Sequence, residues 1–178
     1  MHPQQLHIVT HDIPWPAGHG GFIDLFYKIK ALHAIGVRIH LHCFHTNRQA
    51  QPELEKYCVR VHYYRRRKSI SRFSFRLPFI VNSRVSDELI STLQKDNYPV
   101  LLEGIHCTYP LFKDLLGNRK VLVRLHNAEF EYYHQLAQHE RNPLKRFYFR
   151  HESKLLKRYE QVLAAKASFI AVSEQDVA

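Results

Sequence analysis

A strand, loop, helix, strand pattern occupies residues 6–44, which read LHIVTHDIPWPAGHGGFIDLFYKIKALHAIGVRIHLHCF. The short apolar run 6–10 predicts a strand, and two prolines and three glycines exclude regular structure in the loop 11–21. Apolar residues then recur at helical spacing through 22–32, and Gly36 supplies a stop signal. The run 37–44 predicts the second strand.

The same alternation continues along the rest of the chain. Further strands are predicted at 59–64, 99–103, 120–125 and 168–172, and helices at 86–97, 109–116, 129–139 and 143–165. Strands that alternate with helices predict an α/β fold with a Rossmann-like parallel sheet and helices on both faces. The apolar runs 100–102 and 121–123 suit strands that are buried on both sides.

Length and composition indicate one globular domain. The chain has 178 residues, of which 45% are hydrophobic and 24% charged. No apolar run reaches the roughly 18 residues of a membrane span, and we expect no secretory signal. The three cysteines, Cys43, Cys58 and Cys107, form no Cys-x-x-Cys pair, so neither a disulfide framework nor a cysteine zinc site is expected, which suits a reducing cytoplasm.

The net charge of +10 is concentrated in two segments. Residues 60–84 hold eight basic residues and no acid, and residues 141–166 hold eight basic residues and two acids. Arginines are interleaved with aromatic residues in 65–76, a pattern that suits a membrane surface or nucleic acid. In the helix 143–165, Arg146, Arg150, Lys154 and Lys157 form a basic stripe, for which a merely solvated surface is the alternative. The side chains expected to face the core are Leu144, Tyr148, Leu155, Tyr159 and Val162.

Ligands of a parallel sheet bind beyond the carboxyl ends of its strands, which selects the segments 11–21, 103–106 and 126–129. Gly18, Gly20 and Gly21 open a helix whose N–H groups could hold a phosphate, or they simply make a turn. A dinucleotide fingerprint is not expected, because Ile23 breaks the G-x-G-x-x-G spacing.

Two further side chains follow predicted strands. His126 could move a proton or bind a polar ligand, or it could be a packed histidine. Glu103 could orient a substrate hydroxyl, or it could pair with a nearby arginine. The histidines at 40, 42, 45 and 106 lack a carboxylate at ligand spacing, so no metal site is predicted.

Two stretches together resemble a known family. His11-Asp-Ile-Pro-Trp-Pro-Ala-Gly-His-Gly-Gly21 is similar to the first loop of retaining GT-B glycosyltransferases of family 4, in which Asp-x-Pro-Tyr/Trp-Pro precedes paired glycines and the first helix. Arg124-Leu-His-Asn-Ala-Glu-Phe-Glu-Tyr-Tyr133 is similar to the Arg-x-His-Asn-x-Glu-x-x-Tyr-Tyr stretch of one bacterial branch. The likeness covers nearly all of residues 6–176.

The resemblance implies the N-terminal, acceptor-side half of a two-domain enzyme. Residues 1–178 would form this single Rossmann-like domain, and the donor-binding domain would lie outside this chain, which has no Glu-rich donor motif. The implied reaction transfers a sugar from a nucleotide diphosphate sugar, a co-substrate rather than a cofactor, to a hydroxyl with retention. Its implied setting is bacterial cell-surface polysaccharide or glycolipid synthesis, and the chain alone would be inactive.

The resemblance also implies roles for individual residues. His126 would be catalytic and lie near the reacting sugar, and Gly20 and Gly21 would lie near the diphosphate. Asn127 and Glu129 complete the second motif as substrate-binding residues, and Glu103 matches a cleft position only loosely.

Partners follow from the resemblance and the charge together. A saccharide or lipid-linked acceptor is expected at the cytoplasmic face of the membrane, with peripheral contact through the basic run Arg65, Arg66, Arg67 and Lys68. A sugar- or nucleotide-binding module without catalysis is the alternative function. The basic charge also raises nucleic-acid binding, but no nucleic-acid motif accompanies it, so no nucleic-acid partner is expected.

Overall fold

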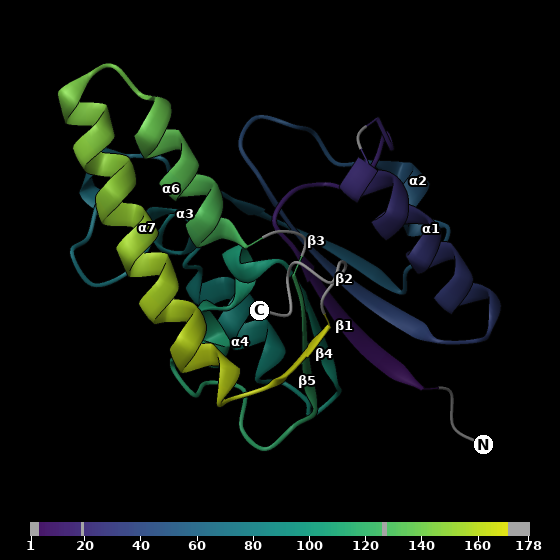
Figure 1. Ribbon diagram of the computed structural model, residues 1–178. Coiled ribbons are helices and arrows are strands. Elements are labelled where there is room, and N and C mark those ends of the chain that lie inside the picture. Colours follow the sequence, from purple (N-terminus) through teal and green to yellow (C-terminus); the bar gives the residue numbers. More distant parts are fainter. Residues whose placement is uncertain (1–3, 19, 126–127, 171–178) are drawn as a thin grey trace.

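Six strands form one sheet in the order β3-β2-β1-β4-β5-β6, and every neighbouring pair is parallel (Figure 1). The computed structural model describes residues 4–18, 20–125 and 128–170. The strands are β1 Gln5–Thr10, β2 Arg38–His45, β3 Arg60–Arg65, β4 Val100–Glu103, β5 Val121–Arg124 and β6 Ser168–Ile170. This strand order is that of a Rossmann-like α/β fold, which confirms the predicted fold class.

The helices between the strands begin and end at local signals. They are α1 Gly20–Ala34, α2 Pro52–Glu55, α3 Phe79–Asn82, α4 Asp87–Leu93, α5 Tyr109–Phe112, α6 Glu129–His139 and α7 Pro143–Ala164, with single 3₁₀ turns at Ile70–Arg72 and Ile105–Cys107. Asn142 caps α7 by accepting hydrogen bonds from the backbone N–H groups of Leu144 and Lys145. Gly36 follows α1 with a φ of 84°, a left-handed conformation that favours glycine.

Alternate residues of the strands fill two separate cores. Ile8 and Leu41 pack on one face of the sheet beneath α1 and α2. Val9, Leu102 and Val123 pack on the other face beneath α3, α4, α5 and α7. Figure 1 shows this division, with α1 and α2 on one side of the strands and α4 and α7 on the other.

The sequence predicts most bounds correctly and misses some short elements. The helix α2 was not predicted, and the helices expected at 86–97 and 109–116 end at Leu93 and Phe112. The run 100–102 is buried as expected, whereas in β5 only Val123 is fully buried. None of the helices in the described part of the chain has both the length and the apolar character of a membrane span.

The predicted inward face of α7 is partly wrong. Leu155 and Tyr159 are buried, but Leu144 is 80% exposed and Val162 is 45% exposed. On a helix of 3.6 residues per turn, Leu144 and Val162 lie at the margin of the face centred on the fully buried Leu156. Two apolar side chains that periodicity assigned to the core therefore lie on the surface.

A chain of polar side chains, buried at His7, His42 and Tyr64 and half-buried at Asp96, crosses the strand face beneath α4. We call it the histidine chain: Asp96, His7, His42 and Tyr64. His7 contacts Asp96 through Nε2 at 3.0 Å and His42 through Nδ1 at 2.8 Å, and His42 Nδ1 lies 2.9 Å from the Tyr64 hydroxyl. Two neutral imidazoles satisfy all three hydrogen bonds, since each then donates one and accepts one.

Burial keeps both imidazoles of the histidine chain neutral. It lowers the pKa of His7 and lowers that of His42 well below the usual histidine value, although Asp96 acts in the opposite direction on His7. His40, which the sequence analysis grouped with His42, lies beside His7 with the rings tilted and their centroids 5.1 Å apart. Among the described residues, no group of three His, Cys, Asp or Glu side chains could hold a metal ion.

The two histidines of the histidine chain predict a loss of stability in mild acid. Below a pH of about 6.5 they bind protons in the unfolded chain but not in the folded chain, so their contribution to the free energy of unfolding falls as pH falls. Burial raises the pKa of Glu152 and of Glu160 to about 7, and these two carboxyls act in the opposite direction between about pH 4.5 and 7. Each histidine held neutral contributes up to about 1.4 kcal/mol per pH unit in that range. Urea unfolding at neutral and acidic pH measures the loss.

The variant His42→Gln tests the assignment, because an amide can keep both hydrogen bonds and does not titrate. It should lose less stability on acidification than the wild-type protein, whereas His139→Gln, at an exposed position, should behave like wild type. Equal acid sensitivity of His42→Gln and wild type would contradict the assignment.

Candidate functional site

The carboxyl ends of β1, β4 and β5 lie side by side at one edge of the sheet. Thr10 pairs with Glu103, and Glu103 pairs with Arg124. The order of the strands reverses between β1 and β4, because β2 and β3 follow on one side and β4, β5 and β6 on the other. At such a reversal the connecting loops separate and leave a crevice, which is where ligands bind in open parallel sheets.

The loop after β1 is held in one shape by its own residues. Asp12 Oδ1 accepts a hydrogen bond from the Ile13 N–H at 2.7 Å, and the Ile13 side chain is fully buried. The Trp15 ring packs on Phe26 of α1 at 4.6 Å between centroids. The Arg48 guanidinium donates to the carbonyl oxygens of Ile13, at 2.6 Å, and of Trp15. The Asp-Ile-Pro-Trp stretch thereby fixes the path of the chain into α1.

The glycines leave open space at the N-terminus of α1. Gly20 and Gly21 begin the helix, and a Cβ built at Gly18 or Gly21 would meet no atom of the described residues within 4 Å. The first turn of α1 contains no acidic residue. The first N–H groups of a helix lack partners within the helix and carry partial positive charge, so this end of α1 can receive an anion.

Side chains from three loops meet beside this helix end. The rings of His11 and His106 stack at 4.8 Å, and His11 also lies 5.7 Å from the Phe22 ring of α1. His106 Nε2 is 4.0 Å from Glu129 Oε1, at the start of α6. Arg84 donates from Nε to the His11 carbonyl at 3.2 Å, and burial lowers the pKa of Arg84 to about 10. The loops after β1, β4 and β5 are thus in contact with one another.

A second group of contacts joins α1 to the ends of β4 and β5. We call Glu103, Lys28, Arg124 and Asp24 the Glu103 cluster. The Glu103 side chain is fully buried and accepts hydrogen bonds from Lys28 Nζ at 2.6 Å and from Arg124 Nη1 at 3.3 Å. Asp24 Oδ2 lies 2.7 Å from Arg124 Nη1 and 3.6 Å from Lys28 Nζ. Two carboxylates therefore balance two cations at the edge of the sheet.

The structure brings several of the predicted site residues to this edge. Gly18, Gly20, Gly21, Glu103 and Glu129 lie on the loops and termini described above. The predicted residues His126 and Asn127 lie outside the described residues.

Sequence reasoning missed several residues of this edge. It did not select Lys28 or Asp24. It included His11 and His106 only as members of the segments 11–21 and 103–106, and it weighed His106 individually only as a metal ligand. Asp24 and Lys28 lie four residues apart in α1, and this i, i+4 spacing was the sequence signal that could have indicated a charged pair on one face of the helix.

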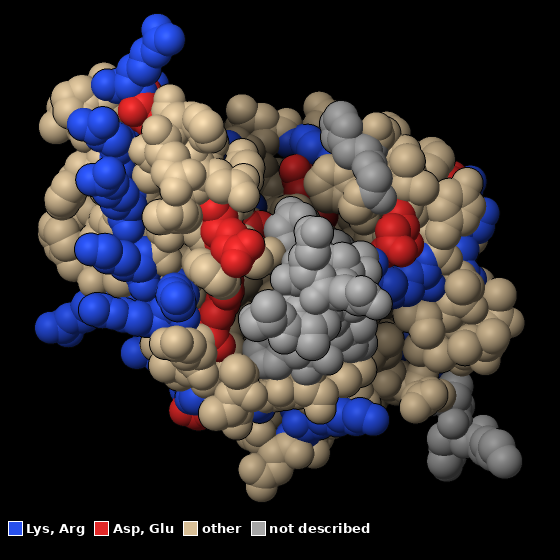
Figure 2. Space-filling view, viewed as in Figure 1, with Lys and Arg blue, Asp and Glu red and all other residues tan. Residues whose placement is uncertain are grey.

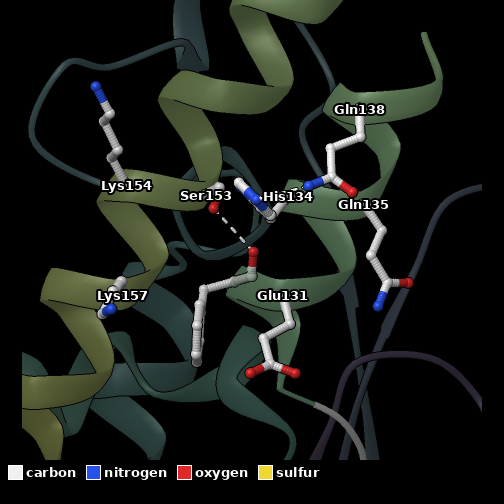
Figure 3. A pocket seen from close by; sticks show the side chains of 8 residues that line it. Glu131, His134, Gln135, Gln138, Ser153, Lys154 and Lys157 are labelled. Carbon is white, nitrogen blue, oxygen red and sulfur yellow. Dashed lines mark hydrogen bonds between the residues drawn. The ribbon is translucent and has the colours of Figure 1, made fainter.

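A separate groove lies between α6 and α7. It has a volume of about 510 Å³ and is lined by Phe130, Glu131, His134, Gln135, Gln138, Ser153, Lys154 and Lys157. Figure 3 shows Ser153 bonded to the Phe130 carbonyl, at 2.9 Å, which ties the two helices together. In the same view Lys154 extends from α7 away from α6. Charged side chains of both signs line the groove, and its lining residues do not include those of the strand edge.

Comparison with known proteins finds a related sequence. No protein-family model matches this chain. Over 153 residues it is 30% identical to an uncharacterized 44.6 kDa protein in the cps (capsule polysaccharide) region of Klebsiella pneumoniae. The alignment covers 82% of this chain, which spans 39% of the length of that relative. The fold and the arrangement of the strand ends define a Rossmann-like α/β domain. The location of the homologue in a capsule polysaccharide region is compatible with a role in polysaccharide synthesis.

The Glu103 cluster predicts a specific loss of stability. The double variant Lys28→Met/Arg124→Met leaves a buried carboxylate without its cations and should lower the free energy of unfolding by about 3–5 kcal/mol. Adding Glu103→Gln to that variant removes the uncompensated charge and should restore part of the loss. Urea unfolding measures both effects, with Lys95→Met at an exposed lysine as control. A double variant within about 1 kcal/mol of wild type, well below the cost expected for an unpaired buried charge, would contradict this role.

Proposed function

We propose that this chain is the acceptor-side domain of a retaining GT-B glycosyltransferase of family 4 that acts in bacterial cell-surface polysaccharide synthesis. The observation that carries the proposal is the open N-terminus of α1 beside the ends of β4 and β5, where the strand order reverses. An anion held there would have access to side chains from three loops. The fold and this edge agree with what the resemblance of segments 11–21 and 124–133 implies.

The related sequence supports the biological setting of the proposal. Its cps region is a capsule polysaccharide region, which favours an enzyme of polysaccharide assembly. The chain spans 39% of that relative, so the activity of the whole protein, including a donor-binding domain outside this chain, is part of the proposal.

The proposed reaction forms a bond between an acceptor hydroxyl oxygen and the anomeric carbon of the donor sugar. The bond from that carbon to the diphosphate oxygen breaks on the same face, and the electron pair leaves with the diphosphate. The hydroxyl proton passes to the departing phosphate oxygen. Negative charge therefore grows on the diphosphate, and the N–H groups of Gly20 and Gly21 would stabilise it.

The remaining residues would divide into contact and positioning roles. His126 would contact the reacting sugar, and Asn127 and Glu129 would bind substrate hydroxyls. The carboxylate oxygens of Glu103 receive Lys28 and Arg124, so Glu103 would act on the substrate mainly by holding α1 and β5 in place.

The variant His126→Ala tests the catalytic assignment in the protein that contains both domains. Loss of one positioned polar group should lower kcat by about 10²–10³-fold with the fold retained. Transfer of sugar from nucleotide diphosphate sugars is the measurement, and the chain alone should show no turnover. A kcat/KM near wild type would make His126 structural, and binding of a nucleotide sugar without turnover by the two-domain protein would favour the non-catalytic module.

The variant Gly21→Val tests the diphosphate position, because it separates stability from activity. The Cβ of valine would meet no atom of the described residues within 4 Å, and valine is a better helix former than glycine, so the melting temperature should stay the same or rise slightly. Transfer should nevertheless fall strongly, since the side chain would occupy the place of the diphosphate. Ala31→Val, on the exposed face of the same helix, is the control for adding a valine to α1: it should leave transfer unchanged and lower the melting temperature only slightly, since valine is a poorer helix former than alanine. Unchanged sugar transfer by Gly21→Val would contradict the placement of the diphosphate at the start of α1.

A further inference from the structure

Exposed apolar and basic side chains share one face of α7 and its neighbouring loop. We define the α7 face as Leu144, Phe147, Arg150, Lys154 and Arg158 of α7 together with Phe75 of the loop 66–78. At a rise of about 1.5 Å per residue, the part of this face that runs along α7 from Leu144 to Arg158 is about 20 Å long. The loops after β1, β4 and β5, which form the strand edge, contribute none of these residues.

The apolar members of the α7 face are strongly exposed and lie close together. Phe75 is 71% exposed, Phe147 is 66% exposed and Leu144 is 80% exposed. Phe75 and Phe147 both lie against the His151 ring, at 5.2 and 6.5 Å between centroids. Single exposed apolar residues are common on soluble proteins, but a group of large ones indicates an interaction surface.

The charge around these residues is of one sign. Arg150, Lys154 and Arg158 are exposed, and Figure 2 shows Lys and Arg side chains in a column over α7. The two acids of α7 do not offset this charge, because Glu152 is fully buried and Glu160 is half-buried. The loop 66–78 contributes Arg76 and contains no acid.

The loop is fixed against α7 by hydrogen bonds. The buried Glu152 carboxylate accepts from the Phe79 N–H at 2.7 Å, directly after the loop. His151 Nε2 lies 3.4 Å from the Ser74 carbonyl, and Asn82 donates to the Arg72 carbonyl at 2.7 Å. Phe75 and Arg76 are thereby held beside α7 without a ligand, so little ordering is needed on binding.

We propose that the α7 face docks this domain on an anionic lipid bilayer. The cations would contact lipid phosphates, while Phe75, Leu144 and Phe147 would enter the boundary between headgroups and acyl chains. A soluble polyanion would use the charge but not the large exposed apolar side chains. The combination therefore favours a lipid surface, and this proposal is independent of the glycosyltransferase assignment.

This surface differs from the basic run 65–68 expected from the sequence. Arg66 is half-buried, and its Nε donates to the Ser83 hydroxyl at 3.0 Å. Arg84, which belongs to the same basic segment, is almost fully buried beside the strand edge. Arg67 and Lys68 are exposed at the start of the loop, so they would flank the α7 face rather than form its centre.

Vesicle sedimentation tests the proposal. The purified chain is mixed at low salt with vesicles of phosphatidylcholine alone or of phosphatidylcholine with phosphatidylglycerol. It should pellet only with the anionic vesicles and should be released as salt rises. The charge variant Arg150→Gln/Lys154→Gln should bind about 25-fold more weakly, since each cation near an anionic surface strengthens binding about 5-fold.

A second variant separates a membrane from a soluble polyanion. Phe75→Ser/Phe147→Ser keeps every cation and should weaken vesicle binding while leaving retention on heparin unchanged. Lys95→Gln/Lys120→Gln, at exposed lysines on other elements, should bind vesicles nearly as well as wild type. Thermal melts check that the variants are folded.

The proposal is overturned if the wild-type chain stays in the supernatant with anionic vesicles at low salt. It is also overturned if the folded phenylalanine variant binds vesicles as tightly as wild type, because the surface would then be a general polyanion site.

Discussion

Glu103, the last residue of β4, has a fully buried carboxylate, and the arrangement of the candidate site depends on the two cations that contact it. Lys28 comes from α1 and Arg124 from β5, so Glu103 joins the first helix to the neighbouring half of the sheet. An unpaired charge at this depth would cost several kcal/mol. The pairing therefore holds the open N-terminus of α1 beside the loops that follow β4 and β5. The strand edge, with its balanced charges, differs in this respect from the α7 face, where cations and large apolar side chains lie in solvent.

Much of the fold could be predicted because apolar spacing reports directly on burial. The six strands and the helices α1, α6 and α7 lie within a few residues of their predicted bounds. Periodicity failed where the surroundings of a helix decide exposure. Leu144 follows the apolar spacing of α7, but it lies in the first turn, where it is 80% exposed. The helix α2 has only four residues and one buried side chain, Leu54, which is too short for a periodic signal.

The site could be predicted as a location but not as a set of contacts. The rule that ligands bind at the carboxyl ends of parallel strands selected Glu103 and the glycine loop, and the structure brings both to one edge. The partners of Glu103 could not be identified, because Lys28 and Arg124 lie 75 and 21 residues away in the sequence. Likewise, nothing in the basic segment 60–84 predicts that the side chains of Arg66 and Arg84 are half-buried and buried. Charge counts along a sequence therefore overstate the charge that a surface presents.

The central claim is that the N-terminus of α1, beside the ends of β4 and β5, is an anion-binding edge. The most direct test is to follow backbone amide chemical shifts by NMR while a nucleoside diphosphate is added to the chain at moderate salt. The account predicts shifts at the amides of Gly20, Gly21 and Phe22 and in the segments 104–107 and 124–129, even if binding is only millimolar. Shifts confined to α7 and the loop 66–78, with the start of α1 unchanged, would contradict it.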